Sequence, residues 1–394
     1  MNMQSSIWVL YLAYCGLHLA QIGLLEGIYH ATSIVCEIPS GAAADLWGRK
    51  RCMILSNLCI AVSCVIMLFS KSFGWFAVSF AVQALGNNLN SGSEEALVYD
   101  SMKCLGQEEH YMGVYGRLNV LIEVAQGFAT VAGGVLAEFS YFWCYAACVV
   151  IAVLALLPVL GMAEPPQCGK AADTAGRSAK DAPAEGTPAQ RTIWETVKHH
   201  FAVSACILQK DARIGKIIGF YSVVFAAHTL LFFYSQQYFA DFGYNKVQIS
   251  VIMLLVGGTS CLGALASAKM YRRFGKRCLI PKTVIIAAAI LCYGSEKAGV
   301  AAAALMCAGF ANAALYPVQS DSLNALIPSE QRATLISVDS MCFSIAMIVL
   351  FPLAGAFADR WGLKTVLLLF GAILLLFLLT VFCIEKESFS SDHS

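Results

Sequence analysis

Apolar residues in this 394-residue chain fall into long continuous blocks, separated by short polar stretches. A helix needs about 20 such residues to cross the hydrocarbon core of a bilayer. Apolar residues make up 58% of the chain and charged residues only 13%, whereas soluble domains are close to half apolar and a quarter charged. The blocks therefore exclude a soluble protein. Because they do not alternate in polarity, they also exclude a transmembrane β-barrel.

The blocks predict an all-α membrane protein with twelve transmembrane helices. We expect these helices at residues 4–18, 22–44, 52–70, 74–102, 114–138, 140–162, 213–240, 246–271, 278–294, 298–327, 333–358 and 364–384. The first block lacks the basic region and the cleavage site of a signal peptide, so we expect it to be retained as a short membrane helix.

One long polar gap separates the sixth predicted helix from the seventh. Its first part, "EPPQCGKAADTAGRSAKDAPAEGTPAQ", has the composition of a linker. After it, Ile193, Val197 and Phe201 recur at helical spacing and predict an amphipathic helix at the membrane surface. The predicted domains are an N-terminal six-helix bundle (1–163), a cytoplasmic linker with this helix (164–212), a C-terminal six-helix bundle (213–385) and a cytoplasmic tail (386–394).

Basic residues predict the orientation of the helices. Of the 26 Lys and Arg residues, 21 fall on the same side as the N-terminus, and cytoplasmic loops are the ones enriched in Lys and Arg. Both termini are therefore predicted to be cytoplasmic. The net charge of +1 gives no electrostatic reason to expect a nucleic-acid partner.

The 16 Cys residues lie mostly as single residues in apolar blocks, where Cys behaves as a small apolar side chain. None has the spacing of a metal site. We expect no metal and no cofactor, and a monomer surrounded by the lipid bilayer.

Four related segments recur along the chain: "GAAADLWGRK", "GGVLAEFS", "GALASAKMYRRFGK" and "GAFADRWGLK". Gly41 and Gly134 are 93 residues apart, Gly263 and Gly355 are 92 apart, and the two pairs are offset by 222 and 221 residues. Each copy ends the second helix of a three-helix unit. Inverted three-helix repeats, paired into two pseudo-symmetric six-helix bundles, are the architecture of many secondary transporters.

The segment "GAAADLWGRKR" resembles the cytoplasmic loop signature of the major facilitator superfamily, Gly-x-x-x-Asp-(Arg/Lys)-x-Gly-(Arg/Lys)-(Arg/Lys). The matching residues are Gly41, Asp45, Gly48, Arg49 and Lys50. The stretch "SGSEEALVYDSMK" resembles the bacterial branch grouped with drug–proton antiporters. The resemblance implies a secondary transporter that works by alternating access, with this loop closing the cytoplasmic side.

Three positions depart from the patterns of the superfamily and of this branch. Leu46 stands where a basic residue is usual, and the fourth helix lacks the usual arginine. The glycine-proline bend of the fifth helix is missing, with Ala129 and Thr130 in that region. These departures bear on the coupling mechanism rather than on the fold.

Elementary chemistry gives each loop residue a role. We expect Gly41 to let two helices approach closely, and Gly48 to adopt a positive φ. Asp45 is expected to face the N-terminus of a neighbouring helix. Alternatively, the loop only orients the helix pair. On the opposite side of the membrane, Asp359 and Arg360 could form an outer counterpart.

Ionisable residues within membrane helices are costly and mark transport pathways. Polar residues form one stripe on each of the second, fourth and fifth helices, which fits a water-filled cavity. The predicted proton-coupling residues are Glu94, Glu95, Glu37 and Glu123. For Glu37, a hydrogen bond to a neighbour near the helix end is an equal alternative. Two further expectations are that Glu26 and Glu138 are solvated near the outer surface, and that Arg117 pairs with Asp100 or Glu123.

The second half has fewer charges and more aromatic residues along its predicted helices. Carboxylates on one wall and aromatic rings on the other suit a lipophilic or cationic ligand. The predicted substrate-cavity residues are His30, Asn87, Asn90, Gln126, Tyr221, His228, Phe232, Asn312, Tyr316 and Asp339. We expect the two histidines to serve in packing or hydrogen bonding more than as proton carriers.

The sequence therefore predicts proton-coupled export of a lipophilic or cationic small molecule across the bacterial cytoplasmic membrane. Two alternatives are a proton-coupled uptake symporter for a sugar, peptide or organic acid, and a non-transporting sensor that docks partners through its linker. No phosphate-binding glycine loop and no nucleophile elbow occurs, so nothing in the chain predicts an enzyme.

Overall fold

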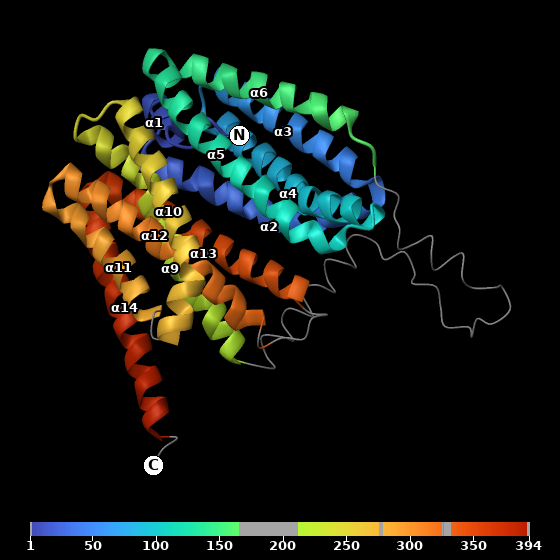
Figure 1. Cartoon of the computed structure of the whole chain (residues 1–394). Coiled ribbons are helices and arrows are strands. Elements are labelled where there is room, and N and C mark those ends of the chain that lie inside the picture. Colours follow the sequence, from blue (N-terminus) through green and yellow to red (C-terminus); the bar gives the residue numbers. More distant parts are fainter. Residues whose placement is uncertain (1, 165–211, 276–278, 325, 327–331, 392–394) are drawn as a thin grey trace. The chain divides into compact units, whose positions relative to one another are not determined.

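A computed structural model describes residues 2–164, 212–275, 279–324, 326 and 332–391. Within these ranges the chain forms twelve α-helices and no strand (Figure 1). The helices are α1 (Trp8–Tyr14), α2 (Leu19–Trp47), α3 (Arg49–Phe69), α4 (Phe73–Cys104), α5 (Tyr111–Phe139), α6 (Tyr141–Gly161), α9 (Ala212–Asp241), α10 (Lys246–Phe274), α11 (Leu279–Cys292), α12 (Ala298–Asn324), α13 (Arg332–Trp361) and α14 (Leu363–Ser391). Two short 3₁₀-helices, η1 (Glu108–His110) and η3 (Tyr293–Ser295), precede α5 and α12.

The predicted all-α architecture is confirmed, and each predicted membrane helix corresponds to one α-helix. Eight of the described helices are long and apolar enough to cross a membrane by length and composition: α3, α5, α6, α9, α10, α12, α13 and α14. The apolar segment Pro281–Ser295, which covers most of α11 and η3, is shorter.

The helices α1, α2 and α4 do not meet these criteria of length and composition, for identifiable reasons. α1 has only seven residues. α4 carries several asparagines together with Glu94, Glu95 and Asp100, and α2 carries Glu26 and Glu37. Such polar residues lower the mean hydropathy of a helix, and inside a membrane protein they face the protein interior rather than lipid.

Contacts between residues divide the chain into two compact units. Unit 1 contains Ala31–Gln126 and the described part of Tyr145–Cys206, and unit 2 contains Asn2–His30, Gly127–Cys144 and the described part of Ile207–Ser394. The limits of the two units fall inside helices, whereas the predicted domain limits follow the internal repeat. The predicted domain limits therefore stay a prediction. The predicted linker and its amphipathic helix lie almost wholly outside the described residues.

Small polar residues hold the helices of unit 1 together, and Figure 1 shows α3 and α4 running alongside each other. Ser63 and Ser79 join these two helices, with 3.1 Å between the hydroxyl oxygens. Ser33 of α2 and Asn88 of α4 exchange two hydrogen bonds of 2.9 and 2.7 Å. Because each of these side chains finds its partner on the facing helix, the pairs fix the register of α4 against α2 and α3.

Aromatic packing dominates unit 2. The rings of Tyr234 on α9 and Phe351 on α13 are stacked with centroids 4.7 Å apart, and Trp8 of α1 packs edge-on against Phe233 at 5.2 Å. The Tyr234 hydroxyl donates to the Phe351 carbonyl at 3.1 Å. Tyr234 is fully buried, and its hydrogen bond satisfies the polar end of an otherwise apolar ring.

Candidate functional site

Gly48 is the single residue between α2 and α3, and its φ of +94° confirms the predicted left-handed turn. A side chain at this position would be strained, since that region of backbone conformation favours glycine. A Cβ atom here would also lie 3.0 Å from the Glu164 carboxylate. The glycine is therefore required twice, for its φ and for the approach of this carboxylate.

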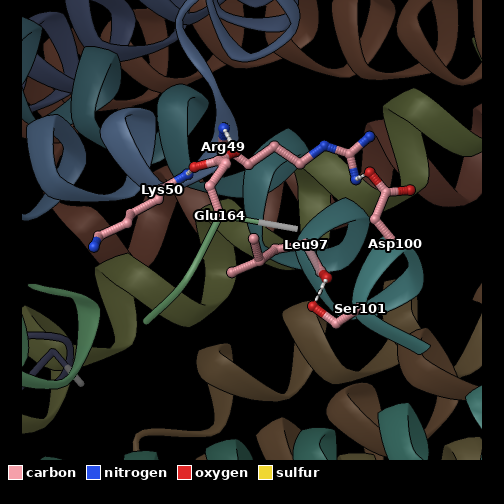
Figure 2. Close-up of polar contacts among 6 residues, drawn as sticks. All are labelled: Arg49, Lys50, Leu97, Asp100, Ser101 and Glu164. Carbon is pink, nitrogen blue, oxygen red and sulfur yellow. Dashed lines mark hydrogen bonds and ion pairs between the residues drawn. The ribbon is translucent and has the colours of Figure 1, made fainter. Parts of the chain in front are cut away.

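Glu164 binds the first turn of α3 (Figure 2). Its Oε1 accepts from the backbone N–H of Arg49 at 2.7 Å, and its Oε2 accepts from that of Lys50 at 2.9 Å. A carboxylate at this place satisfies amides that lack a partner within the helix and interacts favourably with the helix dipole. In the sequence, Glu164 falls within the predicted linker (164–212), and its role could not be predicted because no periodic pattern marks a residue after a helix end. The side chain of Asp45, predicted to cap a helix, lies outside the described part of the chain.

The basic residues of the loop have defined partners rather than only facing solvent. Arg49 Nη1 lies 2.7 Å from Asp100 Oδ2 on α4 (Figure 2), and Lys50 Nζ donates to the Leu160 carbonyl at 2.9 Å on α6. Asp100, one of the two partners expected for Arg117, pairs with Arg49 instead. These contacts tie α3 to α4 and α6.

Of the four repeat glycines, Gly41 is the one without a neighbour among the described residues, where no heavy atom of another element lies within 4 Å of where its Cβ would be. The expected close approach at Gly41 is therefore wrong for this structure. A Cβ at each of the other three would collide with a facing helix: Gly134 with Ser250, Gly263 with the Phe310 backbone, and Gly355 with the Leu19 backbone.

Two of the predicted proton-coupling acids lie together in unit 1. Glu94 accepts a 2.9 Å hydrogen bond from Asn90, and Glu95 accepts one of 3.2 Å from the hydroxyl of Tyr111. Both carboxylates act electrostatically on Tyr115. The start of α5 thus presents two tyrosine hydroxyls to the acidic pair of α4.

The other two predicted acids lie elsewhere on their helices. Glu37 is half-buried on α2, and Ser40 donates a 2.9 Å hydrogen bond to its backbone carbonyl. Glu123 is exposed on α5. Asn87 and Gln126, predicted to line the cavity, are half-buried on α4 and α5.

Unit 2 contains a contact between aromatic rings of α9 and α12. Phe225 and Tyr316 have centroids 6.2 Å apart, and Tyr221 packs against Phe225 at 5.7 Å. Tyr316 is 63% exposed, so its ring has a free face. Tyr238 of α9 meets Tyr293 just before α12 begins, with centroids 4.5 Å apart. The two helices therefore run antiparallel.

Two buried polar atoms lie on one side of this aromatic contact. Nε2 of His228 and Oδ1 of Asn312 are buried and have no hydrogen-bond partner among the described residues. His228 lies three residues after Phe225, and Asn312 lies four residues before Tyr316. Because the helices are antiparallel, both are displaced from the contact toward the same end, by about one helical turn. A buried polar atom without a partner is costly, so each such atom calls for an explanation.

The remaining predicted cavity residues of unit 2 have partners. Gln319, 2% exposed on α12, donates a 2.6 Å hydrogen bond to Asp339 of α13. Phe232 packs edge-on against Phe233 with centroids 5.5 Å apart. His30 is buried on α2 and hydrogen-bonds to Ser344, with 3.2 Å between Nδ1 and Oγ.

At one end of unit 2, which we call the Leu19 end, α2, α10 and α12 begin while α5 and α13 finish. There Asp359 of α13 accepts from the backbone N–H groups of Leu19 at 2.9 Å and Ala20 at 2.8 Å. Glu138 of α5 accepts from the backbone N–H of Lys246 at 3.0 Å. Each acid thus caps the N-terminus of a helix from the other half of the sequence.

The two caps are related by the internal repeat. Glu138 is the fourth residue after Gly134, and Asp359 is the fourth after Gly355. Asp359 of the second half caps α2 of the first, and Glu138 of the first half caps α10 of the second. Asp359 therefore has a partner in the other half of the sequence, and its outer location stays a prediction. The reciprocal role of Glu138 was missed, although the shared spacing after the repeat glycine could have indicated it.

Close packing accompanies the caps. Ser6 of the segment before α1 hydrogen-bonds to Ser250 of α10, with 2.8 Å between the hydroxyl oxygens, beside Gly134. Gln236 of α9 donates to the Ser5 carbonyl at 2.9 Å. These contacts are hydrogen bonds and small-residue contacts, which hold the helix backbones close together.

Glu26 was expected to be solvated, but its exposed fraction is only 8%. Its Oε1 lies 3.6 Å from Nε2 of His30, one turn further along α2. The close approach of α13 removes this stretch of α2 from solvent, since Gly23 and Gly27 face Phe351 and Pro352.

A family model described as the Major Facilitator Superfamily matches residues 1–295 and 283–392. The uncharacterized MFS-type transporter YxaM of Bacillus subtilis (strain 168) is 20% identical over 379 residues, which are 95% of this chain and 90% of that protein. An uncharacterized transporter of Buchnera aphidicola subsp. Schizaphis graminum (strain Sg) is 29% identical over 137 residues, 34% of each chain.

Solved structures share the fold. The nucleoside transporter NupG aligns with a TM-score of 0.77 at 14% identity, covering 98% of this chain and 94% of its own. A D-xylose-proton symporter aligns with a TM-score of 0.67 at 14% identity, covering 96% and 92%. At these identities the likeness extends to the fold alone.

Proposed function

We propose that this chain, which belongs to the Major Facilitator Superfamily, exports a lipophilic or cationic small molecule in exchange for protons. The family and its relatives make the chain a membrane transporter. The substrate class, the coupling ion and the direction of transport are our proposals, as is its membership of the drug–proton antiporter-like branch.

The observation that carries the proposed substrate class is the site between α9 and α12. The unpartnered atoms of His228 and Asn312 are both able to accept a hydrogen bond. The adjoining rings of Phe225 and Tyr316 offer π-faces. An apolar body with a cationic or N–H donor group would satisfy both acceptors and pack on the rings. An organic acid would bring a further acceptor against these two acceptors.

The caps at the Leu19 end support alternating access. They join the two halves of the sequence through three backbone amides and close small-residue contacts. We assign this end to the outside, because 21 of the 26 Lys and Arg residues belong to the opposite side. On this assignment, the caps close the outer end.

Proton exchange is proposed for the acidic pair of α4. Glu94 and Glu95 have only neutral partners, Asn90 and Tyr111, in the hydrogen bonds that the structure gives them. A carboxylate without a cationic partner exchanges its proton in response to the surrounding water and to substrate charge. Glu37 and Glu123 complete the proposed set.

The experiment that tests this function is dye transport by inside-out membrane vesicles. A lipophilic cation such as ethidium should accumulate when the vesicle interior is acidified, and the accumulation should vanish when the proton gradient is collapsed. The Glu94→Gln/Glu95→Gln variant should lose gradient-driven accumulation. Transport by that variant at the wild-type rate at every pH would remove the coupling role of the pair.

Uptake by proton symport is the second candidate, because the fold is shared with a D-xylose-proton symporter. Accumulation of a sugar by intact cells, with no dye movement in vesicles, would favour it. The sensor alternative depends on the linker, and deletion of residues 166–189 without loss of transport would argue against it.

A further inference from the structure

The buried pair Glu26–His30 is a titratable group that the proposed exchange does not use. Both residues are 8% exposed and lie one turn apart on α2, with 3.6 Å between Oε1 and Nε2. His30 Nδ1 reaches across to Ser344 Oγ on α13 at 3.2 Å. The pair therefore bridges α2 and α13, which are joined at their ends by the Asp359 cap.

Aromatic groups surround the imidazole. The rings of Tyr29 and Phe343 meet it edge-on at centroid distances of 5.4 and 5.5 Å. Among the described residues, no Lys or Arg forms an ion pair with Glu26, so His30 is the cation available to it. From α9, the hydroxyl oxygen of Tyr234 lies 3.4 Å from the carbonyl oxygen of Leu19, whose amide is bound by Asp359. The carboxylate of Asp359 is itself bound by the α2 amides.

Charge counting decides which protonation state fits this place. With no added proton, the pair carries an ionised carboxylate and a neutral imidazole, a net charge of −1. With one proton, held on either group, the pair is neutral overall. A net charge buried among aromatic rings in a membrane protein is costly. The closed arrangement therefore favours the pair that holds one proton.

We propose that Glu26 and His30 form a proton site whose occupancy controls closure of the Leu19 end. When α13 separates from α2, the pair loses Ser344 and gains water, so the ionised carboxylate becomes tolerable and the proton leaves to the outside. Closure takes up that proton again. This inference rests on the proposed alternating access and adds to the Glu94–Glu95 pair a site for regulating the outer gate.

Linkage gives the size of the effect. If closure binds up to one proton, the ratio of closed to open molecules falls by up to about tenfold for each unit of rising pH. In an exporter, a proton arriving from outside would thus promote the return to the outer-closed state.

Hydrogen exchange on the full-length protein in lipid nanodiscs tests the proposal. The amides of Leu19 and Ala20, bound by Asp359, and that of Lys246, bound by Glu138, report closure. After correction for the intrinsic exchange rate, their protection should fall from pH 6 to pH 8 in the wild type. A wild type with protection that is constant or rises with pH would overturn the proposal.

Two substitutions at the pair should act in opposite directions. Glu26→Gln removes the charge, so protection at pH 8 should stay as high as at pH 6. His30→Gln leaves a lone buried carboxylate, so protection at pH 8 should fall below that of the wild type. A purely structural role would lower protection in both variants. Such a result, or a Glu26→Gln variant with wild-type pH dependence, would overturn the proposal.

A matched control removes one carboxylate elsewhere. Glu109, exposed in η1, can be changed by Glu109→Gln, and the variant should keep the wild-type pH dependence. Transport is measured separately in vesicles. If Glu26→Gln loses the pH dependence of protection but the wild type shows no proton-driven export, the gate site is retained and the proposed export function is wrong. If the wild type exports with protons but Glu26→Gln keeps the pH dependence, only the gate site is wrong.

Discussion

Asp359, near the end of α13, caps the N-terminus of α2 at Leu19, 340 positions earlier in the chain, with 2.9 Å between the carboxylate oxygen and the amide nitrogen. The repeat supplies a matching contact between Glu138 and Lys246 at 3.0 Å. Two reciprocal helix caps therefore close one end of unit 2, and neither needs a basic side chain as partner. Such caps can form and break with little reorganisation, because the amides can bind water when the carboxylate leaves.

Neutralising either cap should weaken closure of both. Asp359→Asn and Glu138→Gln each remove a charge from a helix N-terminus, which costs about 1 kcal/mol, or roughly a fivefold shift toward the open state. Hydrogen exchange should accelerate in Asp359→Asn at Lys246 as well as at Leu19, and in Glu138→Gln at Leu19 as well as at Lys246.

The control for the caps is Asp321→Asn, which removes an exposed acid on α12 and should leave both amides as protected as in the wild type. Acceleration confined to the amide next to each substituted acid would mean that the two caps act independently, contrary to a single closing end.

Gly355 should tolerate no side chain. A Cβ there would collide with the Leu19 carbonyl and the Tyr234 hydroxyl, so Gly355→Ala should push α2 and α13 apart, lower the melting temperature and increase exchange at Leu19. The matched variant is Gly219→Ala on α9, where no atom lies within 4 Å of the new Cβ. That substitution should be neutral or stabilise the helix by up to about 1 kcal/mol. Equal effects of the two variants would contradict the close approach.

Asn312 should affect stability and binding in opposite directions. Its Oδ1 is buried without a partner, so Asn312→Leu should raise the melting temperature, because a buried unsatisfied polar atom costs about 1–3 kcal/mol. Binding of a cationic substrate should weaken by about tenfold or more, measured as KM for dye transport. His228→Leu should behave in the same way. A variant with lower stability and unchanged KM would show that the atom serves the fold instead.

The helices and the repeat could be predicted from the sequence because both produce periodic patterns of residues. Apolar blocks place α3, α6 and α10 within a few residues, and the glycine spacing relates the Asp359 cap to Glu138. The turn at Gly48 followed from its place between a helix end and a basic cluster.

Long-range pairings could not be predicted in the same way. Glu26 resembles a solvated acid near a helix start, and only the approach of α13 buries it. Likewise, the sequence suggested Arg117 as a partner of Asp100, whereas the packing of α3 against α4 places Arg49 there. No local pattern reports which helix will cover a given face.

Acid should weaken the contact between Glu296 and Lys364. The Lys364 ammonium, which donates a hydrogen bond to this exposed carboxylate, lowers the pKa of Glu296 below its usual value. A lowered pKa in the folded state means that the pair stabilises the protein above the unfolded pKa and loses that effect as pH falls through the folded one. Glu296→Gln should therefore lower the melting temperature slightly at pH 7 and not at pH 3. High salt should abolish this difference in melting temperature between variant and wild type, since the pair is exposed. An equal decrease in melting temperature at both pH values would contradict the predicted role of the ion pair.

The most direct test of proton-coupled export is the simultaneous measurement of proton and dye flux in proteoliposomes with an acidic lumen. Export coupled to protons predicts that a lipophilic cation enters the lumen while protons leave it, and that Asn312→Leu reduces both fluxes together. Movement of dye and protons in the same direction, or dye movement that ignores the gradient, would contradict the account.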